Sequence, residues 1–142
     1  MTAVTVSTNE STSVATTGTP SLWRAGVRSG VIAAAATTAV AAVAHAAGVS
    51  LEDSAGKAFP LYGFAQLTLF FTAVGVLIGK GIRRWNSRPH TTFVRTTLAL
   101  TAVSLIPDAV VNADTGTKLA LACTHVVAAA IVIPALAARL SD

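Results

Sequence analysis

Four long apolar runs constrain this chain more than any other feature of its sequence. They cover residues 26–48, 61–82, 92–111 and 119–138. Each run has about 20 residues or more, which at 1.5 Å rise per residue is enough for a helix to cross a hydrocarbon core of about 30 Å. The runs predict an all-α, integral membrane protein, an antiparallel four-helix bundle.

The composition supports a single membrane domain. The sequence is 53% hydrophobic and 11% charged, whereas charged residues make up about a quarter of an ordinary soluble domain. No hydrophilic block remains to build a second domain, so residues 23–142 are expected to form one transmembrane unit. Residues 1–22 are rich in Ser and Thr and lack apolar periodicity, which predicts a disordered, cytoplasmic tail.

The basic residues are distributed unequally between the two sides of the predicted spans. Eight of the ten Lys and Arg residues fall on one side, and the positive-inside rule assigns that side to the cytoplasm. Both termini are therefore expected in the cytoplasm of a multi-pass protein of the plasma membrane. The eight residues are Arg24, Arg28, Lys80, Arg83, Arg84, Arg88, Arg95 and Arg139.

The net charge of +4 does not indicate nucleic-acid binding, because the basic residues flank membrane spans. Four of them, Lys80, Arg83, Arg84 and Arg88, lie in the loop between the second and third spans. An anionic inner leaflet attracts such a loop by about 1 kcal/mol per basic residue. The loop is thus a candidate inner-leaflet contact, with a plain topology signal as the alternative interpretation.

A second interpretation of the first span is open. Arg24 and Arg28, followed by an apolar stretch and the small residues Ala44–Ala46, resemble a cleaved signal peptide. The preceding region is long for a signal peptide, however, and the apolar stretch has the full length of a span. Cleavage would leave three spans and place the mature N-terminus outside.

Small residues recur at helical spacing in the first two spans. Gly26, Gly30 and Ala34 lie on one side of the first span, and Gly75 and Gly79 form a similar pair in the second. Such residues let helix backbones approach closely, which favours association in lipid. We expect these faces to pack against each other or against a partner.

Polar residues form a stripe along the third span. Thr97, Thr101, Ser104, Asp108 and Asn112 are separated by three or four residues, so they share one face of a helix. A polar face in contact with lipid is costly, so the stripe is expected to point into the bundle. Asp108 stands about one turn from the outer end.

The other spans carry polar groups at a similar depth. His45, Gln66 and His125 each lie in the outer half of their own predicted helix. Because the helices alternate in direction, these groups are expected to converge with the stripe. The candidate intramembrane polar cluster comprises Asp108, His125, His45, Gln66, Ser104 and Asn112.

Several chemistries suit this set. A carboxylate beside a histidine fixes the imidazole tautomer, as proton relays require. Two His and one Asp can hold a divalent metal, and two His can ligate a haem. The structural interpretation is that Asp108 and a histidine satisfy each other and fix helix register, with His45 at the interface and Gln66 in a single interhelical hydrogen bond. No nucleotide-binding, nucleophile-elbow or metalloprotease motif occurs, so no cofactor is assigned.

The C-terminal part resembles a known family. Pro107 and Asp108, the Thr-containing loop before the fourth span, His125 and Pro134 are similar to those of small actinobacterial membrane proteins with four predicted spans and no assigned function. Some members are labelled cell envelope biogenesis proteins. The spacing of the spans agrees over about residues 22–140. The resemblance implies a bacterial integral membrane protein and no particular activity.

Three functional hypotheses follow. The first is a non-enzymatic accessory or envelope-associated membrane subunit that contacts the lipid bilayer and forms a homo-oligomer or joins a partner membrane protein. The second is a small oligomeric transporter or proton-coupled carrier that uses Asp108 with His45 or His125. The third is a haem- or metal-binding membrane protein.

Overall fold

The computed structural model describes residues 21–52 and 55–142. The part of the chain that it describes contains four helices and no strand: α1 (Leu22–Ala46), α2 (Leu61–Trp85), α3 (Pro89–Val110) and α4 (Thr115–Ala137). All four are long and apolar enough to cross a membrane. The prediction of four helices is confirmed, whereas residues 1–20 of the predicted tail lie outside the described residues.

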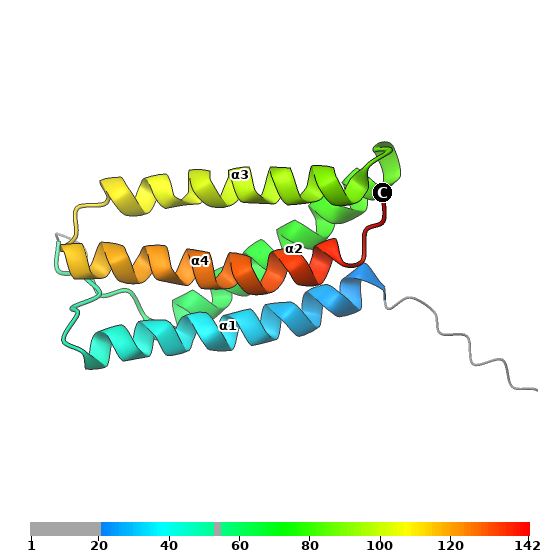
Figure 1. Ribbon diagram of the computed structural model, residues 1–142. Helices are drawn as coiled ribbons and strands as arrows, with labels where there is room; N and C mark the ends of the chain where they lie inside the picture. The colour runs from blue at the N-terminus through cyan, green and yellow to red at the C-terminus, as the bar shows by residue number, and fades with distance from the viewer. Residues whose placement is uncertain (1–20, 53–54) are drawn as a thin grey trace, which may run out of the picture.

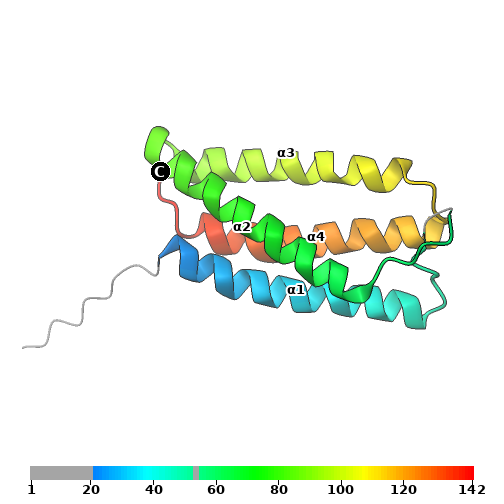
Figure 2. The same ribbon diagram turned by 180° about the vertical axis from the view of Figure 1, so that it is seen from behind.

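The helices alternate in direction along the bundle (Figure 1). The start of α1, the α2–α3 turn and the C-terminus lie at one end, which we call the basic end because eight Lys and Arg residues lie toward it. The α1–α2 and α3–α4 connections lie at the opposite end. Viewed from behind, α2 crosses the other helices obliquely (Figure 2). α1 packs against α2 and α4, whereas α1 and α3 do not touch.

Three of the four helices, α1, α3 and α4, begin before their apolar runs because residues at their N-termini set their starts. Ser21 Oγ accepts a hydrogen bond from Arg24 N at 3.4 Å, and α1 therefore begins at Leu22, the last residue of the predicted tail. Pro89 occupies the first position of α3, where its missing N–H costs nothing. Asp114 Oδ1 accepts from Thr117 N at 3.0 Å and starts α4 four residues before the predicted span.

The small-residue face of α1 lies against α2, as the spacing predicts. Gly26 and Gly30 are buried. A Cβ at Gly26 would lie 2.2 Å from Cγ2 of Val76, and one at Gly30 would lie 3.0 Å from Cγ2 of Thr72. The two backbones thus approach to a distance that only glycine permits.

A threonine contact, which the sequence pattern did not reveal, continues this interface. Thr37 of α1 is 1% exposed, and its Oγ1 lies 3.0 Å from Oγ1 of Thr68 in α2. Thr68 also donates to the carbonyl of Phe64 at 2.7 Å. Thr37 Oγ1 likewise lies 3.2 Å from the carbonyl of Ala34, so either hydroxyl can donate to the other, and the two helices share a hydrogen bond.

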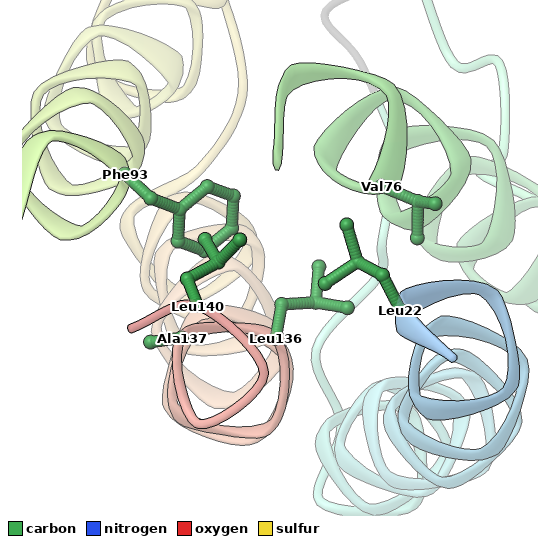
Figure 3. Packing of buried hydrophobic residues seen from close by; sticks show 6 residues of the cluster. All are labelled: Leu22, Val76, Phe93, Leu136, Ala137 and Leu140. Carbon is green, nitrogen blue, oxygen red and sulfur yellow. The ribbon is translucent and has the colours of Figure 1, made fainter. Parts of the chain in front are cut away.

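A buried apolar cluster closes the basic end. Figure 3 shows side chains from all four helices and the C-terminal segment meeting there. Phe93 and Leu136 are fully buried in it, and Gly79 leaves room for both Leu22 and Phe93. The members of the cluster are Leu22, Val76, Phe93, Leu136, Ala137 and Leu140.

A second cluster lies toward the opposite end and includes a loop residue. Leu51, in the α1–α2 connection, is 2% exposed and packs with Ala41, Phe64 and Ala120. Its φ of 51° is in the left-handed region, which is costly for a leucine. Burial of its side chain among three helices offsets that cost.

α3 is the helix least covered by the rest of the chain. Only Pro89 and Phe93, both near its start, are buried. Beyond them, large apolar side chains such as Leu98, Val103 and Val110 are more than half exposed. In a membrane this surface faces either lipid or another polypeptide.

Candidate functional site

An acid–histidine pair joins α3 to α4 toward the end opposite the basic end. Asp108 stands in the last turn of α3, directly after Pro107, and His125 lies in the third turn of α4. Nδ1 of His125 lies 2.8 Å from Oδ2 of Asp108, with 34% of the histidine side chain and 13% of the aspartate side chain exposed. Of the candidate polar cluster, these are the two residues that the structure brings into contact.

The histidine has a defined tautomer. Its Nδ1 also lies 3.1 Å from the backbone carbonyl of Leu121, one turn earlier in α4. A carbonyl oxygen only accepts hydrogen bonds, so Nδ1 carries a proton and Nε2 is the nitrogen left to accept one. The ring is thereby held with one nitrogen toward Asp108.

The aspartate is not fully satisfied by this contact. Oδ2 of Asp108 is buried and has no well-aligned hydrogen-bond partner among the described residues. Its contact with His125 is therefore mainly electrostatic. Burial of a carboxylate oxygen without a well-aligned donor is costly, and His125 is the neighbour that offsets this cost.

The hydroxyl groups in the rest of the α3 stripe donate hydrogen bonds to carbonyl groups of α3 itself. The hydroxyl of Thr97 donates to the carbonyl of Phe93 at 2.8 Å, and that of Thr101 donates to the carbonyl of Thr97 at 2.9 Å. Ser104 is half-buried and donates to the carbonyl of Thr101 at 2.7 Å. Because each hydroxyl bonds a preceding turn, this part of the stripe does not link helices.

Three of the expected cluster members do not join the pair. His45 lies exposed in the last turn of α1, and Gln66 is exposed on α2. Asn112 follows the end of α3 and is also exposed. The expectation that the polar groups of all the helices converge was wrong, because sequence depth gives a side chain's height along a helix but not which neighbour its face meets.

The metal hypothesis required His45, His125 and Asp108 to lie together, and the structure does not bring His45 to the other two. Within residues 21–52 and 55–142, no three His, Cys, Asp or Glu side chains are placed to share a metal ion. His45, His125 and Asp108 therefore do not form the expected three-ligand site. A haem held between His45 and His125 lacks support equally, since His45 is exposed at the end of its helix.

Asp114 ties together the connections near the acid–histidine pair, a role that its place in a loop did not signal. It caps α4, and its Oδ2 accepts a hydrogen bond from Ser50 Oγ at 3.1 Å in the α1–α2 connection. Hydrogen bonds from Thr117, with a smaller one from Ser50, lower the pKa of this carboxyl to about 2. Nearby, Lys118 Nζ donates to the carbonyl of Ala109 at 3.1 Å and so caps the end of α3.

The basic residues of the α2–α3 region are exposed at the basic end. Arg83, Arg84 and Arg88 are all exposed. Lys80, Arg83 and Arg84 were expected in the loop but belong to α2, because the helix continues to Trp85, beyond the apolar run. Lys80 lies one turn before Arg84, with its Nζ 5.9 Å from the ring centroid of Trp23 in α1, which is within the range of a cation–π contact. These side chains are free to meet phosphate groups at a membrane surface.

A double-mutant cycle measures the strength of the acid–histidine pair. We expect Asp108→Ala and His125→Ala each to lower the free energy of unfolding in mild detergent. Their coupling should be about 0.6 kcal/mol and no more than about 1.7 kcal/mol, the range of interhelical polar pairs in membranes. Thr101→Ala is the matched control, because its hydroxyl bonds only its own helix. Strictly additive effects of Asp108→Ala and His125→Ala would show that the pair makes no net contribution.

Comparison with known proteins identifies one family. A family model described as "Family of unknown function (DUF6069)" matches residues 17–142. No curated protein and no solved structure matches the chain. Because the matched region includes all four helices and both residues of the acid–histidine pair, the chain belongs to the DUF6069 family of unknown function.

Proposed function

We propose that this protein is a non-enzymatic subunit of the plasma membrane that acts by binding another membrane polypeptide along the seam between α3 and α4. The partly exposed Asp108–His125 pair carries the proposal: Nδ1 of His125 lies 2.8 Å from Oδ2 of Asp108, and 34% of the histidine side chain and 13% of the aspartate side chain are exposed. A polar group of a second polypeptide would bind to these exposed atoms. The partner is a second copy of this chain or another membrane protein, and no cofactor is required.

The exposure of α3 supports the same surface. Beyond its first turns, α3 is covered only along the side that faces α4. Lipid alone can cover apolar side chains such as Val103 at no cost. Lipid cannot donate a hydrogen bond to a carboxylate, so a seam that contains a carboxylate beside a histidine is better covered by protein.

The orientation belongs to the proposal as well. The excess of Lys and Arg at the basic end supports a cytoplasmic location for that end and, with it, for both termini. The actinobacterial source and the role in the cell envelope that the resemblance implies are part of the same proposal. They are supported by the pattern of Pro107, Asp108 and His125.

Cysteine labelling tests the orientation. In a Cys123→Ala background, we expect Ser50→Cys to react with a membrane-impermeant maleimide on intact cells, because residue 50 lies in the α1–α2 connection. Ser87→Cys, in the α2–α3 turn, should react only after the cells are opened. Both positions are exposed, so the reverse labelling pattern would invert the proposed topology.

Photo-crosslinking tests the partner surface. A photoreactive amino acid at Leu105 on α3, which is half-buried one turn before Asp108, should cross-link to a polypeptide in the native membrane. The same group at Leu77 on α2, which is 65% exposed, is the control and should cross-link mainly to lipid. Asp108→Asn should reduce the Leu105 product severalfold. Lipid adducts alone from both positions would overturn the proposal.

A proton-coupled carrier is the second candidate, and the exposure of His125 favours it. The ring is 34% exposed beside a carboxylate, which gives a proton a route through the pair toward the end opposite the basic end. Purified protein in vesicles should then dissipate an imposed proton gradient, and Asp108→Asn should abolish this activity. A gradient that persists with the native protein would eliminate this candidate.

A further inference from the structure

A narrow apolar groove runs between α1 and α2 in the half of the bundle near the basic end. Its volume is about 180 Å³. Gly26 and Gly30 form its floor on the α1 side, where the two helices are in contact. Trp23 and Leu69, which stand at its two ends, are about half exposed.

The groove has the length of one membrane leaflet. On α1 its lining runs from Trp23 to Val31, and eight residues at 1.5 Å rise per residue span roughly 12 Å. Half of a hydrocarbon core of about 30 Å is roughly 15 Å. The groove therefore extends from the membrane surface at Trp23 to near the middle of the bilayer.

Basic side chains stand at the surface end of this groove. Ala73 and Val76 of the lining share one face of α2 with Lys80 and Arg84, since the spacing between successive residues is three or four. Lys80 Nζ lies 5.9 Å from the Trp23 ring centroid, which places its charge at the mouth. The groove is thus apolar along its length and positively charged at its entrance.

We propose that this groove binds an anionic phospholipid, with one acyl chain lying along the groove over the α1–α2 contact and the phosphate beside Lys80. A basic pocket between membrane helices at the surface of a leaflet suits such a headgroup. A helix from a second copy fits this groove less well than an acyl chain does. A helix with side chains is about 10 Å wide, whereas the groove has a volume of only about 180 Å³. The leaflet would be the inner one under the proposed topology.

The two tryptophans allow a direct test in vesicles of the full-length protein. Trp85→Phe leaves Trp23, at the groove, as the fluorophore, whereas Trp23→Phe leaves Trp85, which is 81% exposed. Phosphatidylglycerol and phosphatidylcholine with brominated acyl chains quench tryptophan on contact. We expect Trp23 to be half-quenched at a lower fraction of brominated phosphatidylglycerol than of brominated phosphatidylcholine, and Trp85 to show a weaker preference.

Two variants distinguish the site from general attraction to charge. Lys80→Gln should reduce the preference of Trp23 for phosphatidylglycerol about fivefold, the factor expected for one basic residue at a membrane surface. Arg95→Gln removes the same charge from α3, which does not touch α1, and should retain the preference. Ala73→Phe fills the groove from an exposed position and should lower quenching by both lipids.

The remaining outcomes overturn the proposal. Equal quenching of Trp23 by the two lipids would show that the groove does not prefer the anionic headgroup. Equal effects of Lys80→Gln and Arg95→Gln would show only a diffuse surface charge. Protection of Trp23 from both lipids would show that a second polypeptide covers the groove. Because both leaflets of the vesicles carry the same lipid, the result does not depend on the topology or on the α3 partner.

Discussion

Gly26→Ala should destabilise the protein by about 2–3 kcal/mol, although alanine is the better helix former. The added Cβ would lie 2.2 Å from Cγ2 of Val76. Val76 cannot rotate away at low cost, because its side chain is β-branched and only 1% exposed. The helices must separate instead, which weakens the α1–α2 interface. Chemical unfolding in mild detergent, followed by circular dichroism, measures the loss.

Gly75→Ala is the matched control. Its Cβ would lie 3.5 Å from Cδ1 of Leu136, an ordinary contact, so we expect a neutral or slightly stabilising effect. Val76→Ala combined with Gly26→Ala should recover much of the lost free energy, because the clashing methyl group is gone. If Gly26→Ala proved as harmless as Gly75→Ala, the close approach of α1 and α2 would be refuted.

Asp114→Ala should lower the melting temperature by about 5 °C, because one carboxylate supports two structures at the end of the bundle. It caps α4 through Thr117 and holds the α1–α2 connection through Ser50. Ser50→Ala removes only the second contact and should have a smaller effect. Asp114→Asn retains an acceptor suited to a helix N-cap and should be milder than Asp114→Ala.

The same carboxylate should make stability depend on pH. Its pKa is lowered from 3.8 to about 2 in the folded protein, so the folded state binds this proton more weakly than the unfolded chain. Its contribution is therefore complete above about pH 5 and is lost as the pH falls toward 2. A melting temperature measured at several pH values between 5 and 2 should decline over that window.

Asp114→Asn isolates this titration. Thr91 hydrogen bonds also lower the pKa of Asp142, so both carboxylates contribute to the decline in the native protein. The Asp114→Asn variant should lose part of the pH dependence, and Asp142→Asn should lose another part. If the two curves matched that of the native protein, neither carboxylate would be hydrogen-bonded in the folded state as described.

The sequence predicted the four helices well because an apolar run of about 20 residues has few other stable forms. It predicted their ends less well. Ser21, Pro89 and Asp114 start helices ahead of the apolar runs, since a cap depends on a local hydrogen bond or backbone angle and not on hydropathy. The spacing of the small residues also correctly predicted that Gly26 and Gly30 of α1 lie at a close helix–helix contact, which they make with α2.

The polar cluster shows where sequence reasoning failed. Asp108 and His125 do meet, but Gln66 and His45 are exposed. The position of a side chain along the helix axis follows from counting residues. The neighbour toward which it points depends on how each helix is rotated and tilted. The oblique course of α2 (Figure 2) is an example, because it determines which of its faces meets α1.

The sequence by itself determined that this chain forms four apolar helices with basic residues gathered at one end, because hydropathy and charge are properties of the residues. Only the tertiary structure decided that Asp108 lies against His125, that Asp114 joins two connections, and that Lys80 stands at the mouth of a groove. Those contacts link residues far apart in the chain, and in lipid they depend on the shapes of facing surfaces rather than on a pattern along one helix.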